Sequence, residues 1–276
     1  LAQYLKTEII SADSRQCYKE LSIGTAKPSK EELNLVPHHF IDCSSIHEPY
    51  NAGKFELEYL EKCHDLFQNH DHLILCGGTG LYIDALTKGL DNFPEVNEST
   101  VTKLEKELAN HGIQYLQEQL QKLDLIYYQS VDLNNAHRLI RALSVIRESG
   151  NPYSSYLNQE KKPRNFKPIY ILLEMDRKQL YQRINFRVDQ MFAQGLLDEA
   201  KSVYPYKHLK SLQTVGYQEL FAYFYGHINL DTAKELIKRN SRRYAKRQMT
   251  WFRRSQDWNR FAHDDFDGIC DLINNY

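Results

Sequence analysis

A short apolar segment that leads directly into ionisable residues is the strongest constraint on this fold. Residues 8–12 read Glu-Ile-Ile-Ser-Ala, and Asp13, Ser14, Arg15 and Gln16 follow at once. The apolar part is typical of a buried strand, and ligands of open α/β sheets lie just beyond the carboxyl ends of such strands. We therefore expect Asp13 and Arg15 to act on a small ligand.

Predicted strands and helices alternate over the first third of the chain. Apolar runs at 39–43 and 72–76 predict two more strands, and helical spacing predicts a helix over 55–67 between them. Another apolar run, at 168–175, predicts a later strand. Alternation of this kind indicates βαβ units and a parallel sheet. The sequence therefore favours an α/β fold with a parallel sheet core.

The middle of the chain has a different pattern. Residues 94–162 are polar, helical in period and without strand signals, and Gly150 and Pro152 end the strongest helix there. We expect a core formed by residues 1–93 and 163–276, with a helical insertion domain at 94–162. The rest of the core is expected to be mainly helical, over 177–194, 214–225 and 231–252, with Asp231 or Thr232 capping the last helix.

Composition narrows the class of protein. Of 276 residues, 42% are hydrophobic and 26% are charged, which is ordinary for a globular protein. No apolar run approaches the roughly 18 residues of a membrane span, and no signal peptide is visible. The five cysteines lack CxxC spacing, and His38, His39 and His47 lack ligand partners, so neither a zinc site nor a disulfide framework is expected. We expect a cytoplasmic protein.

Basic residues gather near the end of the chain. The net charge is −1, yet residues 233–260 contain ten Lys or Arg, opposed only by Glu235 and Asp257. Such a stripe can bind nucleic-acid phosphates. It can equally be a solvated helix face, which is the more common case for a charge run alone.

A glycine-rich turn and two arginines suggest an anion site. Gly77-Gly78-Thr79-Gly80 follows a predicted strand and opens a helix, where backbone amides attract anions, although a tight turn with Thr79 as N-cap is an equal alternative. Arg183 and Arg187 lie four residues apart and share a helix face. They suit phosphate, or else they pair with carboxylates such as Asp189 or Glu199.

Asp13 has structural and chemical alternatives. It can cap a turn, or pair with Arg15 or Lys27. It can also serve as a general base that accepts a proton from a weakly nucleophilic amine as a new bond forms.

Several blocks, in order along almost the whole chain, carry a family resemblance. They are residues 10–16, 23–28, 37–42, 77–82, 137–143, 180–188, 215–219 and 244–251. The chain resembles the bacterial tRNA dimethylallyltransferases.

The resemblance implies a fold, a reaction and a set of site residues. The fold would be related to P-loop kinases, with the insertion gripping tRNA, in a protein expected to be a monomer. The reaction would move a dimethylallyl group from dimethylallyl diphosphate to N6 of adenine 37, with Mg²⁺. By match, Asp13, Thr79 and Arg187 would be catalytic, and Thr79, Arg183 and Arg187 would bind the diphosphate. The matching tRNA contacts are Asp13, Ser14, Arg15, Gln16, Thr79, Val101, His137, Arg138, Leu139, Ile140, Arg141, Gln213, Thr214, Val215, Gly216, Tyr217 and Gln218.

The sequence departs from the family pattern in two features. The family opens with a glycine-rich loop of the form GPTASGKT, which binds the diphosphate and metal, whereas this sequence begins at Leu1 and contains no GxxxxGK[ST]. We expect that loop to precede Leu1 in the native polypeptide, and no metal ligand is identified in the sequence itself. Many members also carry an arginine near the start of the insertion, where this chain has Val101, with Lys103 two residues on.

Three alternatives remain open. An adenylate isopentenyltransferase would prenylate a free nucleotide, although it needs neither the insertion nor the basic stripe. A P-loop kinase for a small metabolite would use Asp13 to activate a hydroxyl. A non-catalytic RNA-binding protein would use the basic segments alone.

Overall fold

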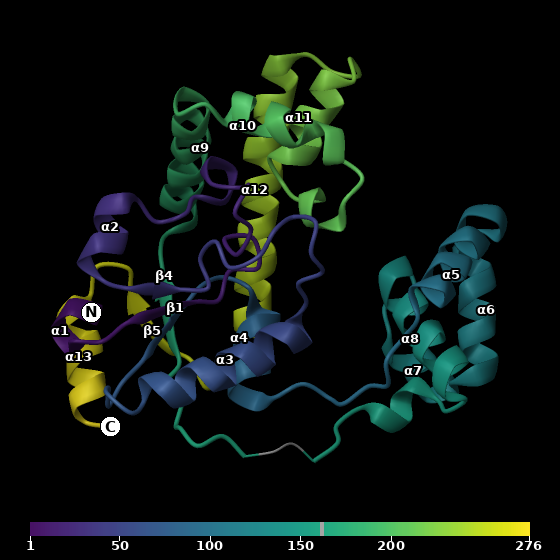
Figure 1. Cartoon of the computed structure of the whole chain (residues 1–276), viewed down its shortest axis with the longest axis horizontal. Helices are drawn as coiled ribbons and strands as arrows, with labels where there is room; N and C mark the ends of the chain where they lie inside the picture. The colour runs from purple at the N-terminus through teal and green to yellow at the C-terminus, as the bar shows by residue number, and fades with distance from the viewer. Residues whose placement is uncertain (161–162) are drawn as a thin grey trace. The chain divides into compact units, whose positions relative to one another are not determined.

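The computed structural model divides the chain into two compact units. It describes residues 1–160 and 163–276. The core unit contains Leu1–Lys88 and Arg164–Tyr276, and the second unit contains Gly89–Pro163 (Figure 1). Residue 162, the expected end of the insertion, lies outside the described residues.

A three-stranded parallel sheet lies in the core unit, in the order β2-β1-β3. Its strands are β1 (Ile9–Ser11), β2 (His38–His39) and β3 (Ile74–Cys76). The central strand β1 pairs on both sides, with Ile9 opposite His38 and Ile74. Ile10 is only 1% exposed. The apolar run at the start of the sequence is thus a buried central strand, as predicted, and its carboxyl end leads directly to Asp13.

The second predicted strand is much shorter than the sequence suggested. It was expected over 39–43, but β2 ends at His39 because Phe40 and Asp42 adopt left-handed backbone conformations, with φ of 64° and 54°. Such angles end the extended strand geometry. The Asp42 amide bonds to the Gln16 carbonyl at 3.1 Å, and its carboxylate pairs with Lys27. The turn therefore serves to hold the segment that follows β1.

A two-stranded parallel sheet pairs distant segments. Strand β4 (Ile171–Glu174) lies within the predicted strand over 168–175 and pairs with β5 (Asn259–Ala262). The sequence did not predict β5. Its four residues include a charged Arg260 and only two apolar positions, so it carries no strand signal that can be read without its partner.

Nine helices of the described core complete that unit. Helix α3 (Ala52–Leu66) buries the predicted face of Phe55, Tyr59 and Cys63 against the sheet. Four further helices are α1 (Ala2–Leu5), α2 (Lys30–Leu35), α4 (Gly80–Lys88) and α13 (Phe266–Asn274). A helical cluster contains α9 (Arg177–Ala193), α10 (Leu196–Val203), α11 (Tyr217–Phe224) and α12 (Leu230–Phe252).

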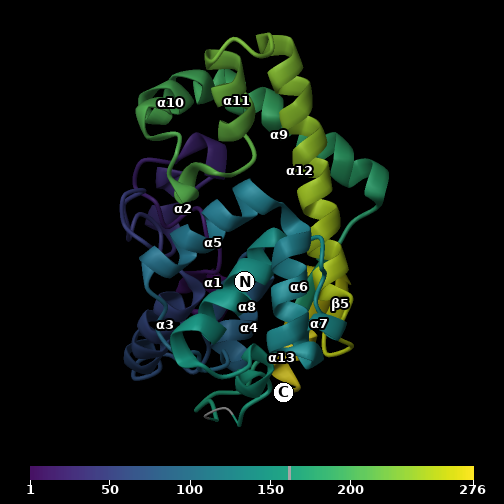
Figure 2. The ribbon, with the colours of Figure 1, turned by 90° about the vertical axis from the view of Figure 1, so that its right-hand side faces the viewer.

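The long helix α12 links the two parts of the core. It packs against α9 and α11 (Figure 2). Further along, it contacts α4. Its cap is Asn229, whose side chain accepts the Thr232 amide at 2.8 Å, so the prediction of Asp231 or Thr232 as the cap was wrong. One helix therefore touches both the arginine-bearing helix α9 and the glycine turn before α4.

The second unit is helical throughout its regular structure. Its helices are α5 (Glu98–His111), α6 (Ile113–Leu123), α7 (Leu125–Ser130) and α8 (Ala136–Ser149). Leu104, Leu116, Leu120 and Leu143 are completely buried between them. Where the chain returns to the core, Arg164 donates to the carbonyls of Ala85 and Leu86 at the end of α4. No helix in the described part of the chain is long and apolar enough to cross a membrane.

Candidate active site at the carboxyl end of the parallel sheet

The ends of β1 and β3 are bonded closely together. The Ala12 amide donates to the Cys76 carbonyl at 2.7 Å, and the Thr79 amide donates back to the Ala12 carbonyl at 3.2 Å. A Cβ at Gly77 would overlap the Ala12 carbonyl group, so this approach requires glycine. Asp13 and Thr79, which follow different strands, are thereby brought side by side.

The Asp13 carboxylate caps its own turn with one oxygen. Its Oδ1 accepts the amides of Arg15 at 2.8 Å and Gln16 at 3.3 Å. The alternative pairings are absent, because Lys27 pairs with Asp42, and the Arg15 guanidinium donates to the Ser211 carbonyl at 3.0 Å. Among the described residues, Oδ2 accepts no hydrogen bond and forms no ion pair. One oxygen is thus fixed by the backbone and the other remains open to a ligand.

Thr79 faces the Asp13 turn with its hydroxyl. The Ser14 amide donates to Thr79 Oγ1 at 3.1 Å, and the Ser14 hydroxyl lies 3.3 Å away. The Thr79 carbonyl accepts the amides of Tyr82 and Ile83, which starts α4. The main chain of Thr79 therefore serves the helix, while its side chain belongs to the site.

Two arginines of α9 remain outside the expected ion pairs. Asp189 pairs with Lys234 and Lys238, and Glu199 accepts backbone amides, so the hypothesis that paired Arg183 and Arg187 with these carboxylates was wrong. Burial lowers the pKa of Arg187, and the nearby Asp13 charge acts against that shift. Arg187 is thus a cation whose charge interacts with that of the Asp13 carboxylate, without an ion pair between them.

Helix α12 supplies three site residues that the sequence analysis missed. Tyr244 lies one helical turn before Gln248 on the same face of α12. Gln248 Nε2 donates to the Gly78 carbonyl at 2.9 Å. A Cβ at Gly80 would overlap Trp251 Nε1, which shows how closely the indole covers the turn. The spacing of 244, 248 and 251 marks one helical face, and this periodicity was the available signal.

Tyr244 keeps part of its ring in solvent beside the carboxylate. The residue is 42% exposed. Burial raises its pKa, and the Asp13 charge shifts it in the same direction, so the phenol is neutral at pH 7. The Arg247 guanidinium lies over the ring, 5.5 Å from its centroid. The site therefore presents an aromatic surface as well as charges.

Gln16 and Tyr217 have internal roles. Gln16 Nε2 donates to the carbonyls of Thr25 at 3.3 Å and Ala26 at 3.1 Å, and its Oε1 accepts the Ser11 hydroxyl at 3.1 Å. Tyr217 is completely buried and donates its phenol proton to Glu199 at 2.7 Å. Both side chains are hydrogen-bonded within the protein around the site.

Glu199 fastens the loop that Gln16 touches. Its carboxylate accepts the amides of Ser22, Ile23 and Gly24 at 2.9, 2.8 and 2.9 Å, in addition to the Tyr217 phenol. A Cβ at Gly24 would lie 2.6 Å from the Tyr217 hydroxyl. The block 23–28 is therefore a clamped loop behind the Asp13 turn.

The remaining predicted tRNA contacts divide by exposure. In the segment 213–218, Gln213 and Gln218 are exposed, Thr214 and Val215 are half-buried, and Gly216 is buried. In the second unit, His137, Arg138 and Arg141 are exposed on α8. Leu139 and Ile140 are buried in the helical core, and Val101 packs against it. Side-chain contact with RNA is thus open to the polar members of each segment.

In the basic segment 233–260, some side chains are bonded to a neighbouring side chain and others are exposed. Lys234 and Lys238 bind Asp189 at 2.9 and 3.0 Å, and Arg242 donates to Asn185 at 2.6 Å. Other basic residues recur at helical spacing along one exposed face of α12, which we call the basic ridge: Arg239, Arg243, Lys246 and Arg247.

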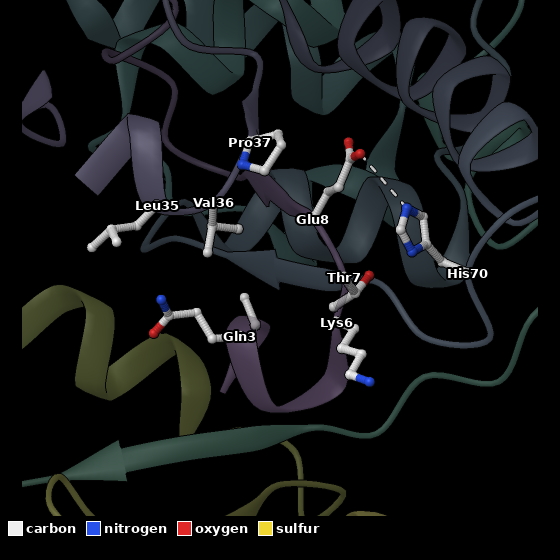
Figure 3. Close-up of a pocket in the computed structure, with 9 residues that line it drawn as sticks. Gln3, Lys6, Thr7, Glu8, Leu35, Val36, Pro37 and His70 are labelled. Atoms are coloured by element: carbon white, nitrogen blue, oxygen red, sulfur yellow. Dashed lines mark ion pairs between the residues drawn. The ribbon is translucent and has the colours of Figure 1, made fainter. Parts of the chain in front are cut away.

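Two hollows lie away from Asp13. A pocket of about 260 Å³ at the amino end of β1 is lined by Glu8 and His70, among others (Figure 3). Another, of about 420 Å³, lies where β4 and β5 end, beside Arg253. No group of three or more His, Cys, Asp or Glu able to hold a metal occurs among the described residues.

Known proteins resemble this chain over most of its length. The family model described as IPP transferase matches residues 16–255. A tRNA dimethylallyltransferase of Christiangramia forsetii is 49% identical, covering 99% of this chain and 92% of that protein. One from Flavobacterium johnsoniae is 48% identical over 100% of this chain and 92% of the relative.

Solved structures agree with the sequence matches. The tRNA isopentenylpyrophosphate transferase of Bacillus halodurans is 37% identical with a TM-score of 0.69, covering 99% of this chain and 88% of that one. A eukaryotic dimethylallyltransferase acting on tRNA reaches a TM-score of 0.81 over 99% of this chain and 75% of its own, at 24% identity, which shows a shared fold.

Proposed function

Because this chain belongs to the IPP transferase family, we propose that it is a tRNA dimethylallyltransferase. It transfers the dimethylallyl group of dimethylallyl diphosphate to N6 of adenine 37, next to the tRNA anticodon. The names of relatives at 49% and 48% identity support this activity. The structural observation that carries it is the Asp13 carboxylate, which has one oxygen open at the carboxyl end of the sheet, close to Thr79 and Arg187.

Asp13 acts as the general base in this proposal. The exocyclic amine of adenine is a poor nucleophile, since its lone pair is delocalised into the ring. The bond between N6 and the prenyl carbon forms as the bond from that carbon to the diphosphate oxygen breaks. The N6 proton passes to Asp13 Oδ2, and diphosphate leaves with the electron pair.

The cations near Asp13 suit the leaving group. Arg187 lies close to the carboxylate, and Arg183 lies one turn before it on the same side of α9. Guanidinium groups bind phosphate oxygens in pairs of hydrogen bonds. We propose that both arginines, with the Thr79 hydroxyl, bind the diphosphate and stabilise its growing charge.

Mg²⁺ belongs to this proposal as a companion of the diphosphate. The described residues do not form a protein cage for a metal. Mg²⁺ usually keeps several waters and binds through substrate phosphates with one or two carboxylates. We propose that the ion enters bound to the diphosphate and neutralises part of its charge.

The tRNA is bound by exposed polar and basic residues in each unit. In the core, the basic ridge and the exposed Gln213 and Gln218 support contacts to the RNA backbone. In the second unit, His137, Arg138 and Arg141 on α8 support the role expected of a tRNA-binding insertion. We further propose a core related to P-loop kinases and a monomer that works in the cytoplasm, where its tRNA substrate is found.

Product analysis with alternative acceptors tests the function. The protein is incubated with dimethylallyl diphosphate, Mg²⁺ and either unmodified tRNA or AMP, and the nucleosides are separated and identified by mass spectrometry. We expect N6-(dimethylallyl)adenosine from tRNA alone. Prenylated AMP would identify an adenylate isopentenyltransferase, ATP turnover with a small metabolite would identify a kinase, and tRNA binding without any product would identify a non-catalytic binder.

A further inference from the structure

We propose that Tyr244 is the surface on which the acceptor adenine stacks when it reaches Asp13. The inference rests on the proposed function and adds a specificity-determining residue to it. It concerns the purine and not the prenyl donor. Tyr244 is aromatic, partly exposed, and carried by the helix face that packs on the glycine turn.

Tyr244 lies where the reacting base must lie. It lies one helical turn before Gln248, which bonds to the Gly78 carbonyl, and two turns before Trp251, which covers Gly80. Thr79, between these two glycines, accepts the Ser14 amide one residue beyond Asp13. Tyr244 is 42% exposed, whereas Tyr18, Tyr59 and Tyr82, which lie near the same end of the sheet, are 5%, 0% and 5% exposed. Tyr244 therefore combines proximity to the carboxylate with a ring that a ligand can reach.

The ring is held in place before any ligand arrives. The helix that carries it, α12, is anchored on the glycine turn by two side chains. One turn along α12, Gln248 bonds to the Gly78 carbonyl, and Trp251 covers Gly80. An aromatic side chain that is fixed in advance loses little conformational entropy on binding, so more of the contact energy is available to the ligand.

A purine gains most from such a surface. A base that leaves the tRNA stack to reach an enzyme pocket loses its stacking neighbours. An aromatic side chain replaces that contact, and every base has a face that can use it. Stacking would also orient the ring plane, so that the exocyclic N6 points along one direction toward the Asp13 oxygen.

The charge beside the ring favours a purine over the prenyl group. The Arg247 guanidinium lies 5.5 Å from the ring centroid. A dimethylallyl group gains positive charge as its diphosphate leaves, and a cation already over the same ring would repel it. A neutral purine meets no such repulsion, and a tRNA phosphate would be attracted by Arg247.

A fluorescent base at the acceptor position tests the stacking directly. An anticodon stem-loop carries 2-aminopurine in place of adenine 37; this base lacks the reactive N6 amine and fluoresces more strongly when unstacked. The fluorescence is measured with the labelled stem-loop saturated by protein. We expect weak fluorescence with the wild-type protein and with Tyr244→Phe, and strong fluorescence with Tyr244→Leu. Tyr225→Leu is the matched control, because Tyr225 is 65% exposed at the end of α11, and it should match the wild type.

Kinetics with unmodified tRNA complete the test. We expect Tyr244→Leu to lower kcat/KM for tRNA about tenfold or more, with an unchanged KM for dimethylallyl diphosphate, and Tyr244→Phe to stay near the wild type. A raised KM for the diphosphate with kcat/KM for tRNA unchanged would overturn the proposal in favour of a prenyl contact. Equal losses in the Phe and Leu variants would assign the effect to the phenol hydroxyl and overturn the stacking proposal. Absence of prenylation by the wild type would instead refute the proposed function, which the fluorescence comparison does not depend on.

Discussion

Gln248 donates a hydrogen bond from its side-chain amide to the main-chain carbonyl of Gly78, 2.9 Å away. The bond joins α12 to the turn that presents Thr79 to Asp13. A side chain at position 78 would have to displace this amide, since a Cβ there would overlap Gln248 Nε2. Residue choice in the glycine turn and residue choice in the last long helix are therefore coupled.

This coupling predicts a double-mutant cycle. Gly78→Ala should lower the free energy of unfolding by about 1–3 kcal/mol, because the new methyl group displaces the Gln248 amide. Adding Gln248→Ala removes the obstacle, so the double variant should be more stable than the sum of the two single losses predicts. Urea unfolding of the four proteins measures the cycle. Gly77→Ala is the control, because its Cβ meets the Ala12 backbone, and Gln248→Ala should not relieve it.

Replacement of Asp13 separates its chemical role from its turn-capping role. Asn accepts the Arg15 and Gln16 amides as Asp does but is not a base, so Asp13→Asn should keep the turn and lower kcat about 10²-fold or more. The Kd for tRNA, measured by filter binding, should stay close to that of the wild type. Asp13→Ala should add a loss of thermal stability. Equal losses of kcat and tRNA affinity in the Asn variant would point to a structural role for the carboxylate.

Neutralising the basic ridge should weaken tRNA binding in a salt-dependent way. Removing one charge that binds a phosphate lowers the slope of log K against log salt by about 1. We expect Arg243→Gln and Lys246→Gln each to show this change in titrations from low to moderate salt. Lys234→Gln is the matched control, because Lys234 is already neutralised by Asp189 at 2.9 Å. Identical slopes in all variants would identify the ridge as an ordinary solvated face.

The cluster at the amino end of β1 predicts a pH-dependent contribution to stability. His70 lies 3.6 Å from the Glu8 carboxylate (Figure 3). His39 lies 2.5 Å from the same carboxylate, and its hydrogen bond lowers the pKa of Glu8 from 4.5. A depressed pKa means that the stabilisation is present above the unfolded value and is lost as the pH falls through the folded value. Glu8→Gln should therefore lower unfolding free energy by about 1 kcal/mol at pH 7 and by less below about pH 4. Unfolding of Glu61→Gln, an exposed change on α3, is expected to match the wild type at pH 7.

The strands that could be predicted are those whose own residues form an apolar run. Strands β1, β3 and β4 are apolar runs, and the buried position of β1 follows from Ile9 and Ile10. Strand β5 forms because β4 offers a partner from a distant part of the chain, since Asn259 bonds to Tyr170 at a separation of 89 residues. The residues of β5 alone do not predict it. The left-handed Phe40 that shortens β2 likewise depends on contacts from distant segments.

Site residues could be predicted where a polar side chain comes directly after a strand. Asp13 and Thr79 each come just after an apolar run, and parallel strands bring such positions together. Tyr244 and Gln248 come from a helix whose basic residues dominate its composition, so the face that packs on the glycine turn was hidden among them. The pairing of Lys234 with Asp189 was also invisible, because sequence alone does not show which carboxylate lies opposite.

The Glu199 clamp has a consequence for the order in which this protein matures. Its bonds to Ser22, Ile23 and Gly24 span 177, 176 and 175 residues, so a very large loop must close before they form. Contacts of such long range slow folding and form late. A growing chain on the ribosome would therefore carry an unfinished region behind Asp13 until α10 has been synthesised. Catalytic competence would arrive as one of the last events in its biogenesis.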